Sequence, residues 1–154
     1  MDIHTCVKES FSVIGKEGST EDGQGFIQLL WRDVQTQFKQ IDPCVKREPN
    51  GRLCGIWGVM SDFSRAFLPW ENNFSSGLYL AGAEVHDDAQ APQGWVKWTI
   101  PGYEYIYVRN NSKNKFAEVR QYLAENNMEL AGAAHDFNCQ KTGQDFIYVP
   151  VKRL

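Results

Sequence analysis

The order of apolar patterns constrains the fold of this chain most, because strand, helix, strand and strand follow one another twice. Residues 11–18 have a short strand pattern, and apolar residues recur at helical spacing within residues 21–42. Pro43 lies just beyond, where it favours the end of a helix. Two more strand patterns, residues 53–61 and 76–86, enclose an aromatic loop.

The second half has the same order of patterns. An aromatic strand pattern with a proline-glycine break covers residues 94–111, and a helical pattern that Ser112 is placed to cap covers residues 113–129. Strand patterns at residues 133–140 and 144–153 then enclose a turn. We predict one α+β domain over residues 1–154, with strand–helix–strand–strand repeats at about 10–86 and 95–153. The antiparallel sheet should carry both helices on one side, with a ligand groove between the repeats.

Composition excludes several classes of partner and site. The net charge of −3, with scattered basic residues, predicts no direct binding to nucleic acid. No apolar run is long enough to span a membrane and no secretory signal is present, so we expect a cytoplasmic protein that does not contact membranes. We expect no metal site and no cofactor, because the cysteines and histidines are scattered: Cys6, Cys44, Cys54, Cys139, His4, His86 and His135.

The aromatic content of 13% indicates a ligand pocket as well as a core. Alternation along a strand sorts side chains onto two faces of a sheet. If Ile147, Val149 and Phe137 face the helices, alternation places a carboxylate among aromatic rings on the other face. That set is Trp57, Tyr79, Tyr105, Asp136 and Tyr148.

The predicted set has three interpretations. Exposure to solvent would leave large aromatic residues together on the surface, which soluble monomers avoid. A dry core would hold an ionised Asp136, at a cost of several kcal/mol unless the charge is paired. A partly wet pocket satisfies both constraints, and its rings and carboxylate would attract a cation, at about 0.5–2 kcal/mol for each ring contact.

Each residue of the set also has an ordinary structural interpretation. Asp136 is alternatively a solvated edge acid or the partner of a nearby Lys or Arg. Trp57, Tyr79 and Tyr148 are alternatively core residues. Trp70, in the aromatic loop at residues 62–75, is either a lid over the pocket or an anchor of that loop.

Three further residues have weaker indications. Glu71, beside Trp70, is either a second ligand carboxylate or a solvated loop acid. Glu84 falls on the face of Leu80 unless a bulge intervenes, and we leave it out of the site. Trp31 has the helical spacing of a core residue.

Three motifs stand out by their order and spacing: "TIPGYEY" (residues 99–105), "ELAGAAHDF" (residues 129–137) and "DFIYVPVK" (residues 145–152). Together they resemble the GyrI-like effector-binding domains, the ligand-sensing modules of AraC-type and MerR-type multidrug regulators. The first motif resembles the step that opens the second repeat of that family and places Tyr105 at its tyrosine. The second resembles the stretch that carries the pocket glutamate, which places Asp136 at that position, and the third resembles the closing strand.

The resemblance implies a domain that binds bulky lipophilic, often cationic, molecules between its repeats. No residues are spare for a helix-turn-helix domain, so we expect a free-standing binding module rather than an enzyme. It would either sequester its ligand or, in a sensing role, act with a separate regulator protein. Asp136 replaces a glutamate and reaches about one carbon less far. His135 and Asn138 replace aromatic residues of the family pattern, so the ligand preference differs.

Two other functions are compatible with the resemblance. Some free-standing members of this family hydrolyse strained cyclopropane rings in DNA-alkylating compounds, and a buried Asp136 could activate water for that reaction. A gyrase inhibitor of the family instead binds another protein. The sequence shows neither a clear acid–base pair nor a conspicuous surface patch.

Overall fold

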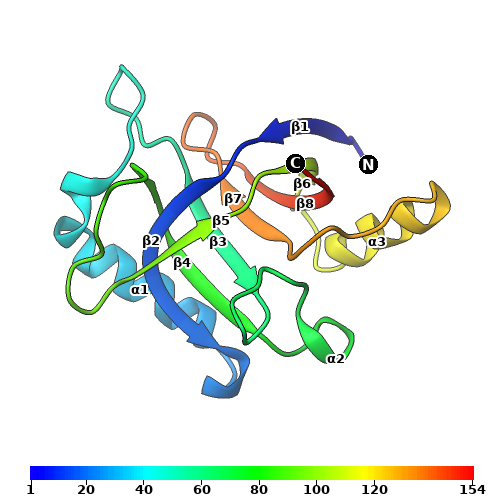
Figure 1. Cartoon of the computed structure of the whole chain (residues 1–154), viewed down its shortest axis with the longest axis horizontal. Coiled ribbons are helices and arrows are strands. Elements are labelled where there is room, and N and C mark those ends of the chain that lie inside the picture. Colours follow the sequence, from blue (N-terminus) through cyan, green and yellow to red (C-terminus); the bar gives the residue numbers. More distant parts are fainter.

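The first half of the chain forms the predicted elements and one additional strand. The structure is a computed structural model that describes all 154 residues (Figure 1). Its elements are β1 (His4–Lys8), β2 (Phe11–Ser19), the 3-10 turn η1 (Thr20–Asp22), α1 (Phe26–Gln37), the 3-10 turns η2 (Phe38–Gln40) and η3 (Asp42–Cys44), β3 (Ile56–Ser61), the short α2 (Glu71–Phe74) and β4 (Leu78–Val85). The helix begins later than predicted, because Gly23 and Gly25 have φ angles of 102° and 84°, outside the helical range.

The second half follows the predicted order throughout. Its elements are β5 (Val96–Ile100), β6 (Tyr103–Arg109), α3 (Lys115–Glu125), β7 (His135–Asn138) and β8 (Asp145–Arg153). Pro101 and Gly102 separate β5 from β6, as predicted. Ser112 does not cap α3, because the turn after β6 continues to Asn114, which is the N-cap residue.

The strand order places the two halves symmetrically about the middle of the sheet. The order is β1-β6-β8-β7-β3-β4-β2-β5, and every pair is antiparallel. The central pair, β3 and β7, joins one strand of each half. Outward from that pair, β4 corresponds to β8 and β2 to β6, so the fold is the predicted α+β sheet.

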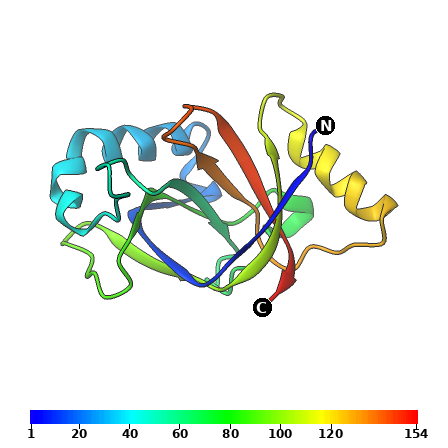
Figure 2. The same cartoon turned by 90° about the horizontal axis from the view of Figure 1, so that it is seen from above.

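The sheet also curls and closes on itself, through pairing between the segment that contains β1 and β2 and the segment that contains β5 and β6. β1 pairs with β6 and β2 pairs with β5, from His4↔Tyr107 through Lys8↔Tyr103 to Phe11↔Ile100. Because β1 continues into β2 and β5 into β6, two long segments pair along their length. Figure 2 shows the resulting curvature. Closure of this kind satisfies backbone groups that an open sheet would leave at its edges.

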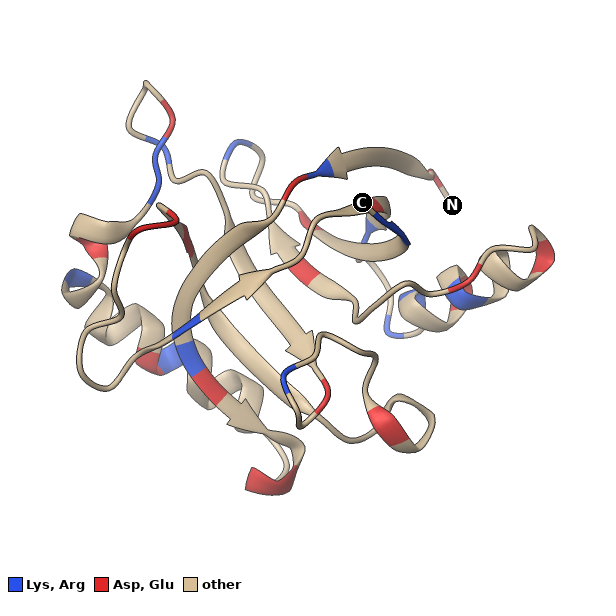
Figure 3. Cartoon of the chain, viewed as in Figure 1, with Lys and Arg blue, Asp and Glu red and all other residues tan.

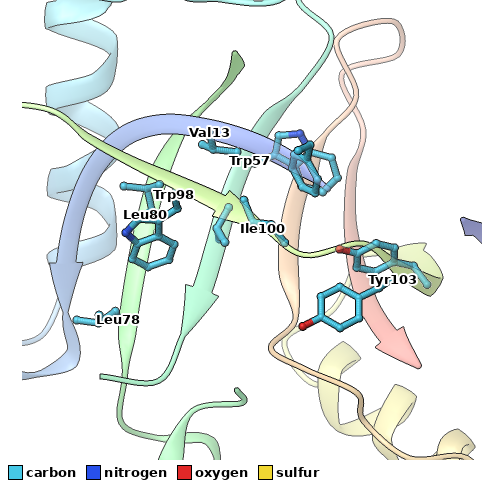
Figure 4. Close-up of a cluster of buried hydrophobic side chains, with 10 residues drawn as sticks. Val13, Trp57, Leu78, Leu80, Trp98, Ile100 and Tyr103 are labelled. Atoms are coloured by element: carbon cyan, nitrogen blue, oxygen red, sulfur yellow. The ribbon is translucent and has the colours of Figure 1, made fainter. Parts of the chain in front are cut away.

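Large side chains fill the inside of the curled sheet. The buried residues of this inner core are Phe11, Val13, Trp57, Val59, Leu78, Leu80, Trp98, Ile100, Tyr103 and Tyr105. Figure 4 shows side chains from β2, β3, β4 and β5 directed toward one another. The rings of Phe137 and Tyr148 pack against this cluster, with centroids 4.5 and 5.2 Å from that of Trp57. Aromatic volume therefore keeps the curled sheet filled.

Both long helices cover the outer face of the sheet. α1 packs on the small residues of β4, where Ala81 and Ala83 are fully buried. α3 packs through Val119 and Leu123 on residues of β6 and β8. The two helices lie apart, with strands between them (Figure 2). None of the helices has the length and apolarity needed to cross a membrane.

Candidate functional site

A cleft of about 340 Å³ lies on the outer face where the two halves of the chain meet. The first half contributes α1, β3 and β4, and the second contributes β7, β8 and the residue after β6. Its lining consists of Ile27, Trp31, Ile56, Gly58, Tyr79, Asn110, Asp136, Phe137, Asn138, Asp145 and Phe146. We call it the Asp136 cleft. Clefts of this size between structural units are where proteins usually bind small molecules.

Three side chains from three elements form a hydrogen-bonded chain at the cleft. Tyr79 of β4 donates its hydroxyl to Asp136 Oδ2 of β7 at 2.9 Å. The indole nitrogen of Trp31, in α1, donates to Tyr79 Oη at 3.3 Å. The chain runs from the helix, across the sheet, to the carboxylate. Because Tyr79 is 1% exposed, its hydroxyl is held in place and so orients Asp136.

A glycine between these residues makes room for the contact. Gly58 of β3 lies opposite Asp136 in the β3–β7 ladder. A Cβ atom at Gly58 would lie 1.8 Å from Tyr79 Oη and 3.2 Å from the Cβ of Asp136. The phenol therefore crosses the sheet only because position 58 has no side chain.

The environment of Asp136 disfavours its charged form. Burial raises the pKa of its carboxyl to about 6, the hydrogen bond from Tyr79 opposes that rise, and the charge of Asp145 adds to it. Burial, together with the neighbouring Asp136, raises the pKa of Tyr79 well above its ordinary value, so the phenol stays a donor. The carboxylate is thus desolvated and lacks a positive partner.

The surrounding strands supply no compensating charge. β3 has no charged residue, β4 has only Glu84, and the acid of β7 is Asp136 itself. Figure 3 shows that most Lys and Arg residues lie away from these central strands. No Lys or Arg lines the Asp136 cleft. The cleft therefore suits a ligand that brings its own positive charge.

The structure divides the predicted aromatic set between two faces of the sheet. Tyr79 and Asp136 lie together on the outer face. Trp57, Tyr105 and Tyr148 instead face the inside, where Trp57 is 2% exposed and Tyr105 is fully buried. The alternation was right, and Ile147 and Val149 do face α3, but Phe137 was wrongly assigned to the same face. Phe137 packs on Trp57 inside the curled sheet, and this turns Asp136 outward toward α1.

Trp70 lies at a different place on the outer face. Its indole nitrogen donates to the carbonyl of Leu78 at 2.9 Å, which anchors the loop before α2. It also lines a smaller apolar cavity of about 120 Å³, with Phe74, Phe116 and Ile147 among the other lining residues. Neither Trp70 nor Glu71 lines the Asp136 cleft.

Several lining residues were outside the sequence-based prediction. Trp31 was interpreted as a core residue, although its ring lines the cleft. Asp145 and Asn138 form a directly opposed pair in the β7–β8 ladder. Alternation already places Asn138 on the face of Asp136, but the register between β7 and β8 was needed to place Asp145 there.

The comparisons with known proteins rest on structure alone. No protein-family model matches the sequence, and no curated protein matches it. Solved structures do share its fold. The EcmrR C-terminal domain aligns with a TM-score of 0.65 at 14% identity, over 99% of this chain and 98% of that domain. The structure therefore confirms the fold of the GyrI-like effector-binding domains.

Three further solved structures share this fold. SAV2435, solved bound to tetraphenylphosphonium, aligns with a TM-score of 0.63 at 16% identity, over 99% of this chain and 94% of that chain. A hydrolase from Listeria innocua aligns with a TM-score of 0.53 at 11% identity, over 98% and 92%. In an EcmrR–DNA complex, the chain spans only 58% of the length of the EcmrR subunit, with a TM-score of 0.66 at 12% identity.

Proposed function

We propose that this protein binds bulky, lipophilic, cationic small molecules in the Asp136 cleft. The observation that carries the proposal is a desolvated carboxylate, with pKa raised to about 6, in a cleft that Trp31 and Tyr79 line and no Lys or Arg enters. SAV2435, which has the same fold, binds tetraphenylphosphonium. A cation of that class would restore charge balance at Asp136.

Recognition would combine three contributions. The apolar side chains Ile27 and Ile56 exclude water, which strengthens electrostatic attraction inside the cleft. The ring of Trp31 adds cation–π attraction, about 0.5–2 kcal/mol for the contact. Asp136 supplies the opposite charge. Because hydrogen bonds already hold these groups, little ordering is required when the ligand binds.

The test is a fluorescence titration with tetraphenylphosphonium. Wild type should bind saturably, with quenching of tryptophan emission that includes Trp31. Asp136→Asn keeps the shape but removes the charge, and should weaken binding at least about tenfold, which is 1.4 kcal/mol. Asp88→Asn, at an exposed acid that does not line this cleft, is the matched control. Equal affinity in wild type and Asp136→Asn would reject the proposal.

We also propose that binding serves drug sensing or sequestration, with a separate regulator protein as the partner in the sensing case. Among the sequence-predicted site residues, Asp136 would touch the ligand, and Tyr79, which is 1% exposed, would hold Asp136 in place. Trp57, Tyr105 and Tyr148 would support the floor of the cleft from inside the sheet. Trp70 would contact only a ligand long enough to reach the neighbouring apolar cavity.

A hydrolase is the second candidate, because Asp136 has the raised pKa of an acid–base catalyst and the Listeria hydrolase has the same fold. That function predicts turnover of a cyclopropane-containing alkylating compound, lost in Asp136→Asn, followed by the absorbance of the compound. Reversible binding of the same compound without turnover would exclude this candidate. Tyr79→Phe would lower a hydrolytic rate if the hydroxyl orients the catalytic carboxylate.

A further inference from the structure

A second carboxylate lies in the Asp136 cleft. Asp145 begins β8, directly opposite Asn138 of β7, and Asp136 is opposite Ile147. Asp136 and Asp145 are therefore diagonal neighbours on the same face, with Cα atoms separated by roughly 7–8 Å. Both acids line the Asp136 cleft, and the charge of Asp145 raises the pKa of Asp136.

The two acids occupy different depths. Asp136 is partly buried beneath Tyr79, whereas Asp145 is exposed at the opening. Asp145 accepts one hydrogen bond from the side-chain amide of Asn138, at 2.8 Å. No Lys or Arg forms an ion pair with either acid. A neutral amide leaves the charge of Asp145 uncompensated and its remaining lone pairs open to a ligand.

The walls between the acids are apolar and aromatic. Ile27 and Trp31 of α1 lie on one side, and Ile56 and Phe146 contribute from the sheet. A ligand that reached both carboxylates would therefore need an apolar middle. One cation at the floor and one at the opening would match the distribution of charge along the cleft.

We propose that the preferred ligands are dications, with two positive groups joined by a short apolar or aromatic spacer that bridges Asp136 and Asp145. This inference rests on the proposed function and specifies its ligand class. Asp136 provides affinity for any cation of suitable shape. Asp145 provides selectivity for a second charge, in a solvated and salt-sensitive position.

The test compares two probes that share a ring and differ in charge. Benzyltrimethylammonium carries one quaternary ammonium group, and para-xylylene-bis(trimethylammonium) carries two at opposite ends of its ring. Each is titrated at low salt against wild type, Asp136→Asn, Asp145→Asn and Asp145→Glu, with Asp88→Asn as control. In wild type, the dication should bind roughly three- to tenfold more tightly than the monocation.

Removing each charge should have a different consequence. Asp145→Asn should bring the dication to the affinity of the monocation and leave monocation affinity unchanged, whereas Asp145→Glu should keep the preference. Asp136→Asn should weaken both probes. Equal affinities in wild type, or a preference unchanged in Asp145→Asn, would overturn the dication inference while monocation binding still supports the proposed function. Failure of both probes to bind wild type would overturn both proposals.

Discussion

At the scale of single residues, Asp136 has opposite effects on stability and on binding. Its carboxylate accepts one strong hydrogen bond, from Tyr79, and has no cationic partner. Burial raises its pKa to about 6 from an ordinary value of 3.8. A group of this kind weakens the folded state when it is ionised and strengthens binding to a cation, so one physical cause gives two predictions.

The affinity for a monocation should fall in acid. With a pKa of about 6, Asp136 is mostly ionised at pH 7 and mostly protonated at pH 5, so affinity should drop about tenfold between them. The bound cation should lower the pKa of Asp136 in return. Calorimetric titration across pH 5–8 measures both effects. In Asp136→Asn the affinity should not change over this range, and a similar slope in that variant would assign the pH dependence elsewhere.

The substitution Asp136→Asn should stabilise the protein at neutral pH. The pKa of Asp136 is about 6 in the folded state and 3.8 in the unfolded state, so between these pH values the folded state binds more protons. The stability of the wild type therefore falls as pH rises from about 4 to about 6. At pH 7 the free energy of unfolding of the variant should therefore exceed that of wild type by up to about 3 kcal/mol. Urea unfolding at pH 7 and pH 4 measures this difference, which should vanish at pH 4. A variant less stable at pH 7 would contradict the desolvation argument.

At the scale of elements, the contact between β4 and β7 across β3 depends on the absence of a side chain at Gly58. The conformation of the loop after β3 depends on the buried carboxylate of Asp62. Gly58 lets Tyr79 cross from β4 to β7. Asp62 is 4% exposed and accepts hydrogen bonds from the backbone of Ala66 at 3.0 Å and Leu68 at 3.2 Å. That loop contains Arg65 and Phe67, whose φ angles of 58° and 60° are unfavourable for side chains of their size.

Gly58→Ala should displace Tyr79 and disrupt the cleft. Its new Cβ would meet Tyr79 Oη at 1.8 Å and Cζ at 2.5 Å. We expect a loss of about 2–3 kcal/mol in the free energy of unfolding and at least about a tenfold loss of ligand affinity. In a Tyr79→Leu background, which lacks both atoms, Gly58→Ala should cost less stability. Additive effects in this double-mutant cycle would show that the tyrosine is not the obstacle.

Asp62→Asn should destabilise the loop through the hydrogen bonds of the carboxylate. Burial acts to raise the pKa of Asp62, but hydrogen bonds from Ser64, Leu68 and Ala66 outweigh it and hold the pKa below its ordinary value. This contribution is present above the unfolded-state pKa and is lost as pH falls through the folded one. We expect a loss of about 1–3 kcal/mol at pH 7, measured by urea unfolding and smaller in strong acid. A loss of equal size at every pH would indicate packing instead.

At the scale of the whole molecule, β1 closes the curled sheet and brings a cation to a buried acid. Glu84 is 5% exposed, on the inner face with Leu80, as strict alternation predicted. Trp57 donates its indole N–H to Glu84 Oε1 at 3.2 Å, and Lys8 Nζ lies 3.3 Å from the same oxygen. Closure of the sheet therefore joins residues that are far apart in sequence.

Lys8→Met should weaken this closure. It retains the apolar part of the lysine side chain but leaves Glu84 without its closest cation, and we expect a loss of about 2–3 kcal/mol in the free energy of unfolding. Val7→Ala, at a neighbouring side chain that is 65% exposed, should change stability by less than about 0.5 kcal/mol. Thermal and urea unfolding of both variants measure the contrast. Equal losses would mean that β1 contributes only backbone pairing.

The molecule shows how far the sequence pattern could predict this site. Apolar periodicity gave both long helices and six strand patterns, which cover seven of the eight strands because the pattern at residues 94–111 contains both β5 and β6. It missed β1, whose residues are mostly exposed or half-buried and therefore show little alternation. It also singled out Asp136, since an acid inside an apolar strand is unusual, and it placed Tyr79 on the face of β4 opposite to Leu78 and Leu80, where the structure has it.

The amino-acid sequence by itself determined the order of elements, the alternation within each strand and the presence of an acid in β7. Only the tertiary structure decided which face each alternating set occupies. Local pattern does not distinguish the two sides of a strand when both are buried, as they are in β4. Curling of the sheet made that choice, because bulky rings such as Trp57 fill the inside while small residues such as Ala81 admit α1 outside. Register then brought Tyr79, Asp136 and Asp145 to one cleft.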